Sequence, residues 1–329
     1  MSLFDAYLMV DWSANSRPKG GKDSIWFCYA AWERGSLDEK RLENPRSRTA
    51  ALEIVTAIAR EHVETGQRLL VGFDFPFGFP AGLTEILGLD GIPWQATWRE
   101  LVALVQDDLG GRRNRNNRFE VAAGFNQQIS RGRGPFWGCP TSKSGPFLST
   151  KKVDSDDCGL DPLRVCDRAI RGPKSTYQLF YNGSVGSQAL TGIPRLEKLG
   201  KELGPICQVW PFETGMQAPD QSARVVLAEI YPSMFPIEKP YPCDIKDAGQ
   251  VKACVVEFAM ADRNKQLGSA LRWKTGRRHE STQADRTGRG LDSRHRMSLG
   301  LGWRPGASAR GKRPNTLKGG SRSSATGPR

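Results

Sequence analysis

Hydrophobic residues gather in short runs along most of the chain, and the spacing of these runs predicts both strands and helices. Apolar runs of roughly four to eight residues are typical of strands. They predict strands over residues 6–13, 24–32, 68–74, 206–211 and 224–231, and the more polar segment 38–44 is a further candidate strand. The run RLLVGFD at 68–74 has no polar face, which indicates a strand in a sheet that is covered on both sides.

Apolar residues at helical spacing predict the remaining elements. Leu52, Val55 and Ile58 recur three residues apart, which predicts a helix that Thr49 caps and that ends near residue 64. Similar patterns predict helices over residues 94–107, 193–203 and 245–262. Three strands followed by an alternation of helix and strand indicate an α/β fold, a mixed sheet that helices flank on both faces.

One internal segment lacks such a pattern. Residues 110–190 are rich in Gly, Asn and Arg, and an irregular stretch of this length inside a domain is usually a functional insertion. Arginines and aromatic rings alternate there, as they do on surfaces that bind single-stranded nucleic acid or a nucleotide, although a solvated loop is the alternative. The set comprises Arg112, Arg113, Arg115, Arg118, Arg131 and Arg133 with Phe119, Phe125, Phe136 and Trp137.

The end of the chain differs in charge from the rest. Residues 263–329 hold 17 Lys and Arg against three Asp and Glu, a charge of +14, whereas residues 1–262 hold 31 against 32, a charge of −1, so the excess positive charge lies in the tail. Its Gly, Ser and Arg content predicts a disordered basic tail behind a domain that spans 1–262. Two interpretations stay open, a basic arm for nucleic acid and the product of a shifted reading frame.

Composition narrows the classes of protein. The seven cysteines include no C-x-x-C pair, which argues against a cysteine zinc site and a disulfide framework, and only three histidines occur. The N-terminus lacks the basic region of a signal peptide, and no apolar run approaches the ~18 residues of a membrane helix. We therefore expect a cytoplasmic protein without membrane contact, and the sequence predicts no oligomeric state.

Four carboxylates lie at the ends of predicted elements. Asp11 and Asp74 end strands, and Glu229 lies late in the last strand. Asp247 precedes Val251 by four residues, at the head of the apolar stripe of the last helix, so it should face the sheet. Carboxylates brought together repel one another, and Mg²⁺ or Mn²⁺ relieves that repulsion and activates water for attack on phosphorus. The four acids are therefore predicted to bind metal and catalyse phosphodiester hydrolysis of a nucleic acid or nucleotide.

Each acid also has an ordinary structural explanation. Asp11 and Asp74 precede turns, where Asp is common. Glu229 would fit a solvated strand edge, and Asp247 would fit the first turn of a helix that Asp244 caps. The spacing alone does not decide between these interpretations.

Four motifs, VDWSANS, GFDFPFGFP, AEIYPS and KDAGQVKA, follow one another along the chain. Over roughly residues 5–262 they resemble a bacterial family, the domain-of-unknown-function family four-two-nine. The similarity is to its alphaproteobacterial branch, which is sometimes labelled molybdopterin guanine dinucleotide synthesis. The resemblance implies an RNase H-like fold with an acidic active site. It assigns the strand acids to Asp11, Asp74 and Glu229, and the final-helix acid to Asp247. After Asp262 the basic tail replaces the Gly-Trp-containing end of the family.

Guanylyl transfer would need a loop that cradles a nucleotide phosphate, and no P-loop motif occurs. The nearest candidate is NGSVGS at 182–187, in which Gly183, Gly186 and Ser187 would offer N–H groups to the phosphate of a cofactor. A plain turn is the alternative. The second hypothesis is thus a non-catalytic protein that binds a nucleotide or cofactor without metal. A third hypothesis is a protein that tethers nucleic acid through its tail.

Overall fold

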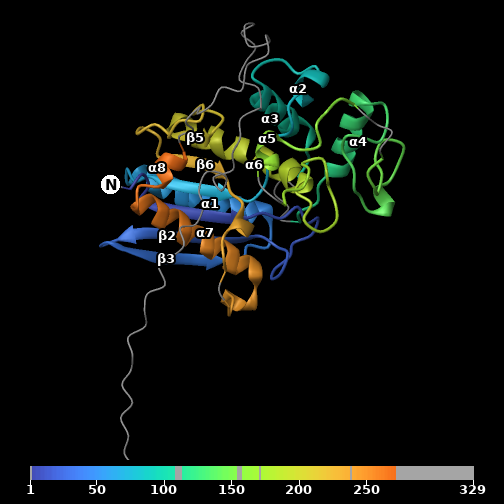
Figure 1. Cartoon of the computed structure of the whole chain (residues 1–329). Helices are drawn as coiled ribbons and strands as arrows, with labels where there is room; N and C mark the ends of the chain where they lie inside the picture. Colours follow the sequence, from blue (N-terminus) through green and yellow to red (C-terminus); the bar gives the residue numbers. More distant parts are fainter. Residues whose placement is uncertain (1, 108–112, 154–157, 170–171, 238, 272–329) are drawn as a thin grey trace, which may run out of the picture.

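The computed structural model describes residues 2–107, 113–153, 158–169, 172–237 and 239–271, which form one mixed sheet with helices on both faces (Figure 1). The chain begins with three strands, β1 (Ala6–Asp11), β2 (Trp26–Glu33) and β3 (Ser36–Glu43). Helix α1 (Arg48–Glu64) then leads into β4 (Leu69–Phe73). These elements confirm the predicted order.

The start of α1 differs from the prediction by two residues. Ser47, not Thr49, is the N-cap residue, and its hydroxyl accepts a hydrogen bond from the backbone N–H of Ala50 at 3.2 Å. Both residue types cap helices well, so the sequence pattern did not separate them.

The six strands are ordered β3-β2-β1-β4-β6-β5. The first three are antiparallel neighbours, whereas β4, β6 (Val225–Glu229) and β5 (Cys207–Trp210) run parallel to β1. Val10 pairs with Phe73, and Phe73 pairs with Glu229. The carboxyl ends of β1, β4 and β6 therefore meet at one edge of the sheet.

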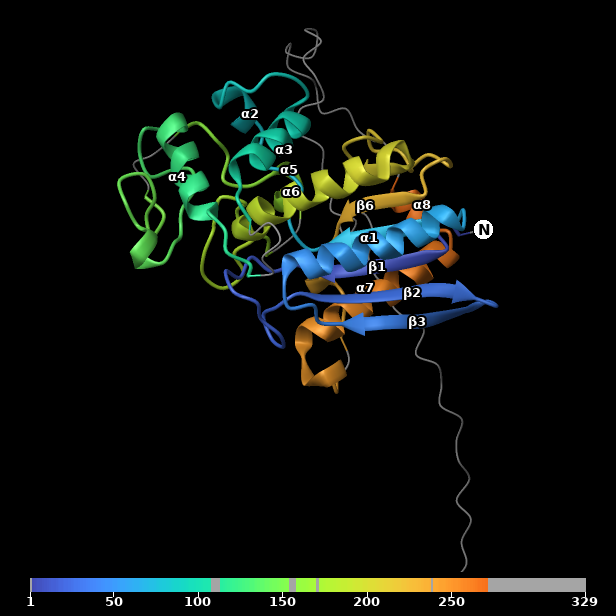
Figure 2. The same cartoon turned by 180° about the vertical axis from the view of Figure 1, so that it is seen from behind.

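Side chains that alternate along the strands divide between two cores. On one face, Leu8, Val71 and Leu227 pack beneath α1 and α6 (Gly186–Leu203). On the other face, Met9 and Val226 pack against α7 (Lys246–Arg263). Figure 2 views the molecule from the side of α1, with the sheet behind that helix and α7 beyond it.

The segment between β4 and β5 is more helical than its sequence suggests. It contains α2 (Leu83–Ile86), α3 (Pro93–Leu104), α4 (Arg118–Ile129), α5 (Val165–Arg168) and α6. Both α4 and the first turns of α6 lie where residues 110–190 were predicted to be irregular, and α6 was expected only from residue 193. Its first turns escape a hydrophobic pattern because Ser187, Thr191 and Gly192 are buried there.

The packed domain continues beyond the predicted boundary at residue 262. Helix α7 is followed by α8 (Leu267–Ala270), and Leu267 and Leu271 are buried. Short 3-10 turns lie at Thr141–Lys143, Gly204–Ile206, Pro232–Met234 and Pro242–Asp244. Most of the predicted basic tail, residues 272–329, lies outside the described residues.

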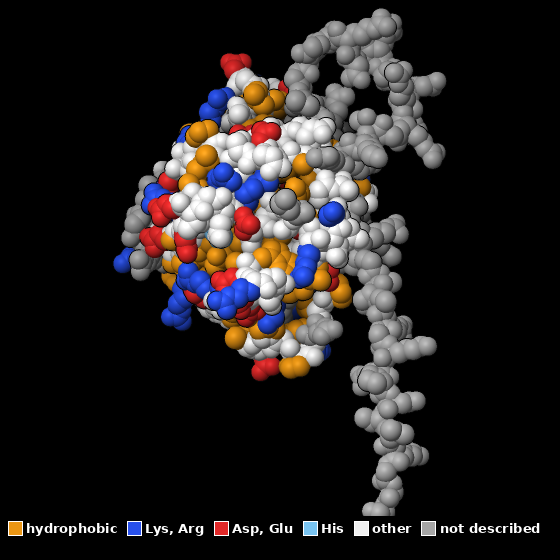
Figure 3. Space-filling model, turned by 90° about the vertical axis from the view of Figure 1, so that its left-hand side faces the viewer, with side chains coloured by type: hydrophobic (Ala, Val, Ile, Leu, Met, Phe, Trp, Pro, Cys, Tyr) orange, Lys and Arg blue, Asp and Glu red, His pale blue; other side chains and the backbone are white. Residues whose placement is uncertain are grey.

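The described residues also show the lengths of the helices and the distribution of surface charge. No helix in them combines the length and the apolar character needed to cross a bilayer. Figure 3 shows basic and acidic side chains intermingled on one side of the molecule, in keeping with the balanced charge of residues 1–262.

Candidate functional site

Three acids reach one edge of the sheet because three parallel strands end there. Asp11 is the last residue of β1, and Asp74 follows the last residue of β4. The backbone N–H of Asp74 donates to the carbonyl of Val10 at 3.2 Å, so the pairing of the two strands continues up to the acids. Glu229 is the last residue of β6. The strand order thus brings together acids that are far apart in the sequence.

Asp11 and Asp74 are hydrogen-bonded to each other. Asp74 Oδ1 also accepts a hydrogen bond from the backbone N–H of Trp12 at 2.6 Å. Burial, and then the charges of Asp74 and Asp247, hold the pKa of Asp11 well above its ordinary value. Burial raises the pKa of Asp74 to about 7, against the opposing effect of the hydrogen bonds from Trp12 and Asp11. Burial and the neighbouring negative charges therefore favour protonation of this pair relative to exposed aspartates.

Asp247 joins this pair from α7. It lies in the first turn of the helix, and its charge raises the pKa of both Asp11 and Asp74. Its Oδ2 accepts a hydrogen bond from the backbone N–H of Asp23 at 2.8 Å, which fixes the loop between β1 and β2 against the helix. Cys254, one of the buried residues of α7, has its pKa raised by burial and then by the charges of Asp74 and Asp11.

Glu229 approaches the site from the opposite face of the sheet. It pairs with Phe73, one position before Asp74, and neighbouring residues of a strand point to opposite faces. Its carboxylate accepts hydrogen bonds from Arg164 Nη1 and Nη2, both at 2.7 Å, and from the backbone N–H of Phe77 at 3.1 Å. The structure therefore groups Asp11, Asp74 and Asp247, and pairs Glu229 with Arg164 instead.

Asp11, Asp74 and Glu229 line a cavity of about 360 Å³ at the sheet edge, whereas Asp247 lies outside its wall. Its wall includes Asp11, Asp74, Glu229 and the Arg164 that pairs with Glu229. Other polar residues around it come from the 110–190 segment, from α6, from α7 and from the chain after β6. They are Asp167, Lys174, Ser184, Gln188, Tyr231, Ser233 and Gln250.

Sequence reasoning missed most of these lining residues, among them Arg164, Lys174 and Tyr231. Arg164 and Lys174 lie in the segment without periodicity, where nothing marks one basic residue above another. Tyr231 follows the last strand within the AEIYPS motif, and its proximity to Glu229 was the one available signal. Gln188, also in the wall, donates from Nε2 to the carbonyl of Trp12 at 2.7 Å and so ties α6 to the residue after Asp11.

The glycine-containing loop before α6 divides into two parts. Gly183 has a φ of +75° and lines the cavity with Ser184 and Val185. Gly186 packs against the chain instead, since a Cβ there would lie 2.2 Å from the carbonyl oxygen of Thr176. The hydroxyl of Ser187 donates to the carbonyl of Leu179 at 2.6 Å. The part of the loop that faces the cavity is therefore Gly183–Val185.

The arginines of the 110–190 segment are spread over several environments. Arg118 is buried, and it donates from Nε to Ser187 Oγ at 2.8 Å and from Nη1 to Ser16 Oγ at 2.9 Å. Burial, and then the charge of Arg48, lower its pKa to about 10. Arg113, Arg115, Arg131 and Arg133 are exposed, and Arg112 lies outside the described residues.

The donor set at Asp11 and Asp74 fits a hard divalent cation. Carboxylate oxygens are preferred ligands of Mg²⁺, which is commonly held by one or two carboxylates together with water and a substrate phosphate. The charges of Asp74 and Asp247 raise the pKa of Asp11, and a bound cation would offset this repulsion. Among the described residues, no group of three or more Asp, Glu, His or Cys side chains is arranged to hold a metal ion. The pair therefore fits Mg²⁺ or Mn²⁺ bound by two protein carboxylates.

No family model matches the chain, and neither do the curated proteins nor the solved structures with which it was compared. The family suggested by the four motifs and the assignment of site residues that it implies stay predictions.

Proposed function

We propose that this protein is a metal-dependent phosphodiester hydrolase with an RNase H-like fold that acts on a nucleic acid or a nucleotide. One observation carries the proposal, namely the hydrogen-bonded carboxyl pair of Asp11 and Asp74 at the ends of adjacent parallel strands. Two buried carboxyl groups in contact are costly for a fold to maintain, and such strained arrangements cluster at active sites.

The strand order supports the finer description of the fold. An antiparallel run of three strands, with further strands parallel to the first on its other side, is the arrangement expected for an RNase H-like sheet. The helix that follows the last strand brings Asp247 back to the acid pair. Three of the four residues that the motif resemblance implies, namely Asp11, Asp74 and Asp247, thus lie where one acidic site could include them.

The acids of the site would have different roles in hydrolysis. Asp11 and Asp74 would hold a Mg²⁺ or Mn²⁺ ion, and the negative charge of Asp247 would strengthen the attraction. The bound ion would supply positive charge next to the phosphate, where negative charge develops during hydrolysis. Glu229, held by Arg164, would shape the wall of the cavity rather than bind the ion.

Hydrolysis of a mixed panel of single- and double-stranded DNA, RNA and nucleotides, with Mg²⁺ or Mn²⁺, tests the proposal. We expect metal-dependent activity that Asp11→Asn and Asp74→Asn each reduce by at least ~100-fold, the scale of an essential catalytic group. Asp90→Asn is the matched control, because this exposed carboxylate lies outside the cavity wall. Activity that survives in both site variants would remove the acid pair from the mechanism.

A second function is favoured by a different observation. Gly183–Val185 lie in the wall of the cavity and offer a loop to a phosphate without any need for a metal ion. A non-catalytic protein that binds a nucleotide or cofactor, as the molybdopterin label of the resembling branch implies, would use the same cavity. Calorimetry separates the two, since this function requires nucleotide binding in EDTA with no hydrolysis after metal is added.

A further inference from the structure

The cavity beside the acid pair is small and bordered by several parts of the chain. Its volume of about 360 Å³ lies near the lower end of the ~300–1,000 Å³ typical of small-molecule pockets. The 110–190 segment contributes Arg164 and Lys174 to the wall, and the chain after β6 contributes Tyr231. A cavity of this size accommodates one nucleotide unit rather than a stack of paired bases.

The wall of the cavity carries more acidic than basic side chains. Asp11, Asp74, Asp167 and Glu229 supply carboxyl groups, whereas the described basic residues of the wall are Arg164 and Lys174. Arg164 already binds both Asp167 and Glu229. Lys174 is exposed, and its aliphatic stem lies against Gly183 in the cavity-lining loop. A phosphate would therefore gain charge stabilisation from Lys174 and from a cation at the acid pair.

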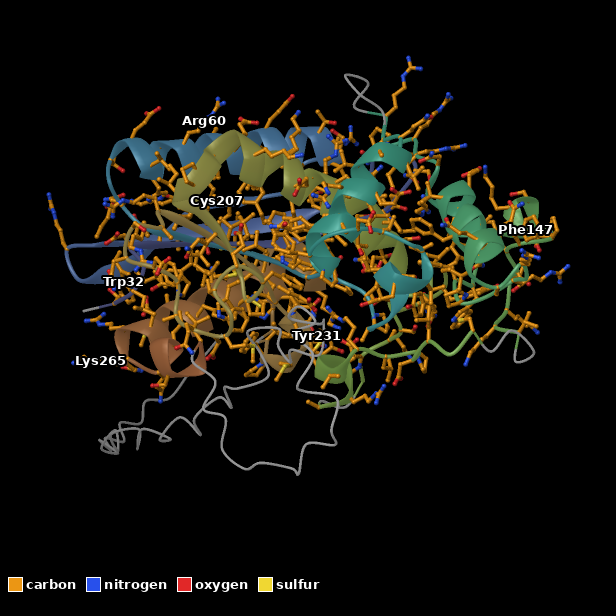
Figure 4. All side chains as sticks on the ribbon, turned by 90° about the horizontal axis from the view of Figure 1, so that it is seen from above. Trp32, Arg60, Phe147, Cys207, Tyr231 and Lys265 are labelled. Atoms are coloured by element: carbon orange, nitrogen blue, oxygen red, sulfur yellow. The ribbon has the colours of Figure 1, made fainter. Side chains whose placement is uncertain are left out.

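Tyr231 provides an aromatic surface in the same cavity. It comes two residues after Glu229, and its hydroxyl lies 3.5 Å from the position that a Cβ on Gly172 would take. In Figure 4, Tyr231 lies between Lys265 at one end of the view and Phe147 at the other. Aromatic side chains stack on the faces of unpaired bases with little regard to base identity. Gln250, also in the wall, carries an amide that can hydrogen-bond the edge of a base or a sugar, whereas Nε2 of Gln188 already donates to the carbonyl of Trp12.

We infer that this cavity binds a single unpaired nucleotide, with its base stacked on Tyr231 and its phosphate between Lys174 and the acid pair. The inference rests on the proposed function and narrows its substrate class. A base within a duplex is stacked and paired, so it would first have to leave the helix to reach Tyr231. Free nucleotides and the unpaired ends of strands are therefore the ligands, and a duplex without ends is not.

Calorimetry with the full chain in Mg²⁺ tests this inference by measuring the affinity for each of several ligands. The ligands are the four nucleoside 5′-monophosphates, ribose 5-phosphate as the base-free analogue, and a duplex closed by a hairpin at each end. We expect at least one monophosphate to bind ~10-fold more tightly than ribose 5-phosphate, within the range reported for stacking of one base. Tyr231→Ala should remove that difference and Tyr231→Phe should keep it, since phenylalanine retains the ring.

Lys174→Gln should weaken the monophosphate and ribose 5-phosphate equally, because both carry the phosphate. Equal affinity of wild-type protein for the monophosphates and ribose 5-phosphate would overturn the inference, as would no binding of any monophosphate. Tight binding of the closed duplex that Tyr231→Ala leaves unchanged would also overturn it. Failure of the hydrolase proposal looks different, because base-dependent binding would then persist with no substrate of the panel hydrolysed.

Discussion

Arg164 holds Glu229 through two hydrogen bonds of 2.7 Å, from Nη1 to Oε2 and from Nη2 to Oε1. The same guanidinium binds Asp167 through Nε at 2.9 Å and Nη2 at 2.8 Å. All three side chains are buried, so each depends on the others for compensation of its charge. Glu229 is consequently committed to an ion pair on the α6 side of the sheet, away from the pair formed by Asp11 and Asp74.

Because Glu229 is paired with Arg164, we expect Glu229→Gln to keep the affinity for Mg²⁺ within about twofold of wild type. Asp74→Asn should weaken that affinity strongly. The glutamine keeps the shape and loses the charge that balances Arg164, so the free energy of unfolding should fall by about 1–3 kcal/mol. Calorimetric titration with Mg²⁺ and urea denaturation measure the two effects. A large loss of metal affinity in Glu229→Gln would instead make Glu229 a metal ligand.

The raised pKa of Asp74 predicts how stability depends on pH. In the unfolded chain an aspartate has a pKa near ~3.9, while burial raises the pKa of Asp74 to about 7 in the folded protein. The contribution of this group to stability is therefore present below pH ~4 and is lost as the pH rises through 7. Asp74→Asn has no such loss and keeps an oxygen for the N–H of Trp12.

In EDTA, Asp74→Asn should accordingly be more stable than wild type by about 1–3 kcal/mol at pH 8, and the difference should shrink toward pH 4.5. Urea denaturation across this range measures it, with the exposed Asp90→Asn as the control that should show no trend. A variant less stable than wild type at pH 8 would mean that the pair is not under electrostatic strain.

The register of the strands explains which part of the site the sequence predicted and which part it did not. Period-two alternation placed Asp11 on the face of Met9, and Glu229 on the face of Leu227, as the structure shows. Whether Asp11 and Glu229 point to the same face of the sheet depends on the register between β4 and β6. No local sequence pattern encodes that register. The acid pair was therefore predictable from strand ends, while the separation of Glu229 from it was not.

Arg48 stabilises the loop that follows Asp11. It is fully buried, binds Asp107 at 2.6 and 2.8 Å, and donates from Nη1 to the carbonyls of Ser13 and Asn15. Arg48→Met should lower the free energy of unfolding by about 3–5 kcal/mol, because it removes one of the two guanidinium groups that balance Asp107.

Arg60→Met is the matched control for this substitution, since Arg60 is an exposed residue of the same helix and pairs with Glu202 at 2.7 Å. A surface pair of this kind contributes about 1 kcal/mol or less. Chemical denaturation of both variants compares them directly, and equal losses would show that the buried network contributes no more than a surface ion pair.

Two glycines of α6 should respond to alanine in opposite directions. A Cβ at Gly186 would lie 2.2 Å from the carbonyl oxygen of Thr176, whereas a Cβ at Gly200 meets nothing within 4 Å. Gly186→Ala should therefore cost about 1–3 kcal/mol through backbone displacement, and Gly200→Ala should add about 0.5–1 kcal/mol of stability through helix propensity. Thermal unfolding of the two variants shows whether each substitution raises or lowers stability. An unchanged stability of Gly186→Ala would show that the loop before α6 adjusts to the added methyl group.

The helical content of residues 110–190 shows where sequence patterns fail for physical reasons. Helix α4 buries Arg118 and Asn126 as well as aromatic rings, and Asn126 bonds to backbone groups of Phe136 and Phe147. Polar residues that serve as internal hydrogen-bond partners break the apolar periodicity on which helix prediction depends. By contrast, the sheet and α7 were predictable because hydrophobic side chains fill their buried faces.

Asp262 joins the two ends of the domain. Its carboxylate accepts hydrogen bonds from the backbone N–H groups of Leu3 and Phe4 and, at 2.6 Å, from the hydroxyl of Tyr7. Phe4 and Asp262 are 258 residues apart in the chain. On a ribosome that adds ~5–20 residues per second, the first strand waits on the order of ten to fifty seconds for that partner. Until α7 emerges, the apolar face that it covers is exposed to contact with other chains.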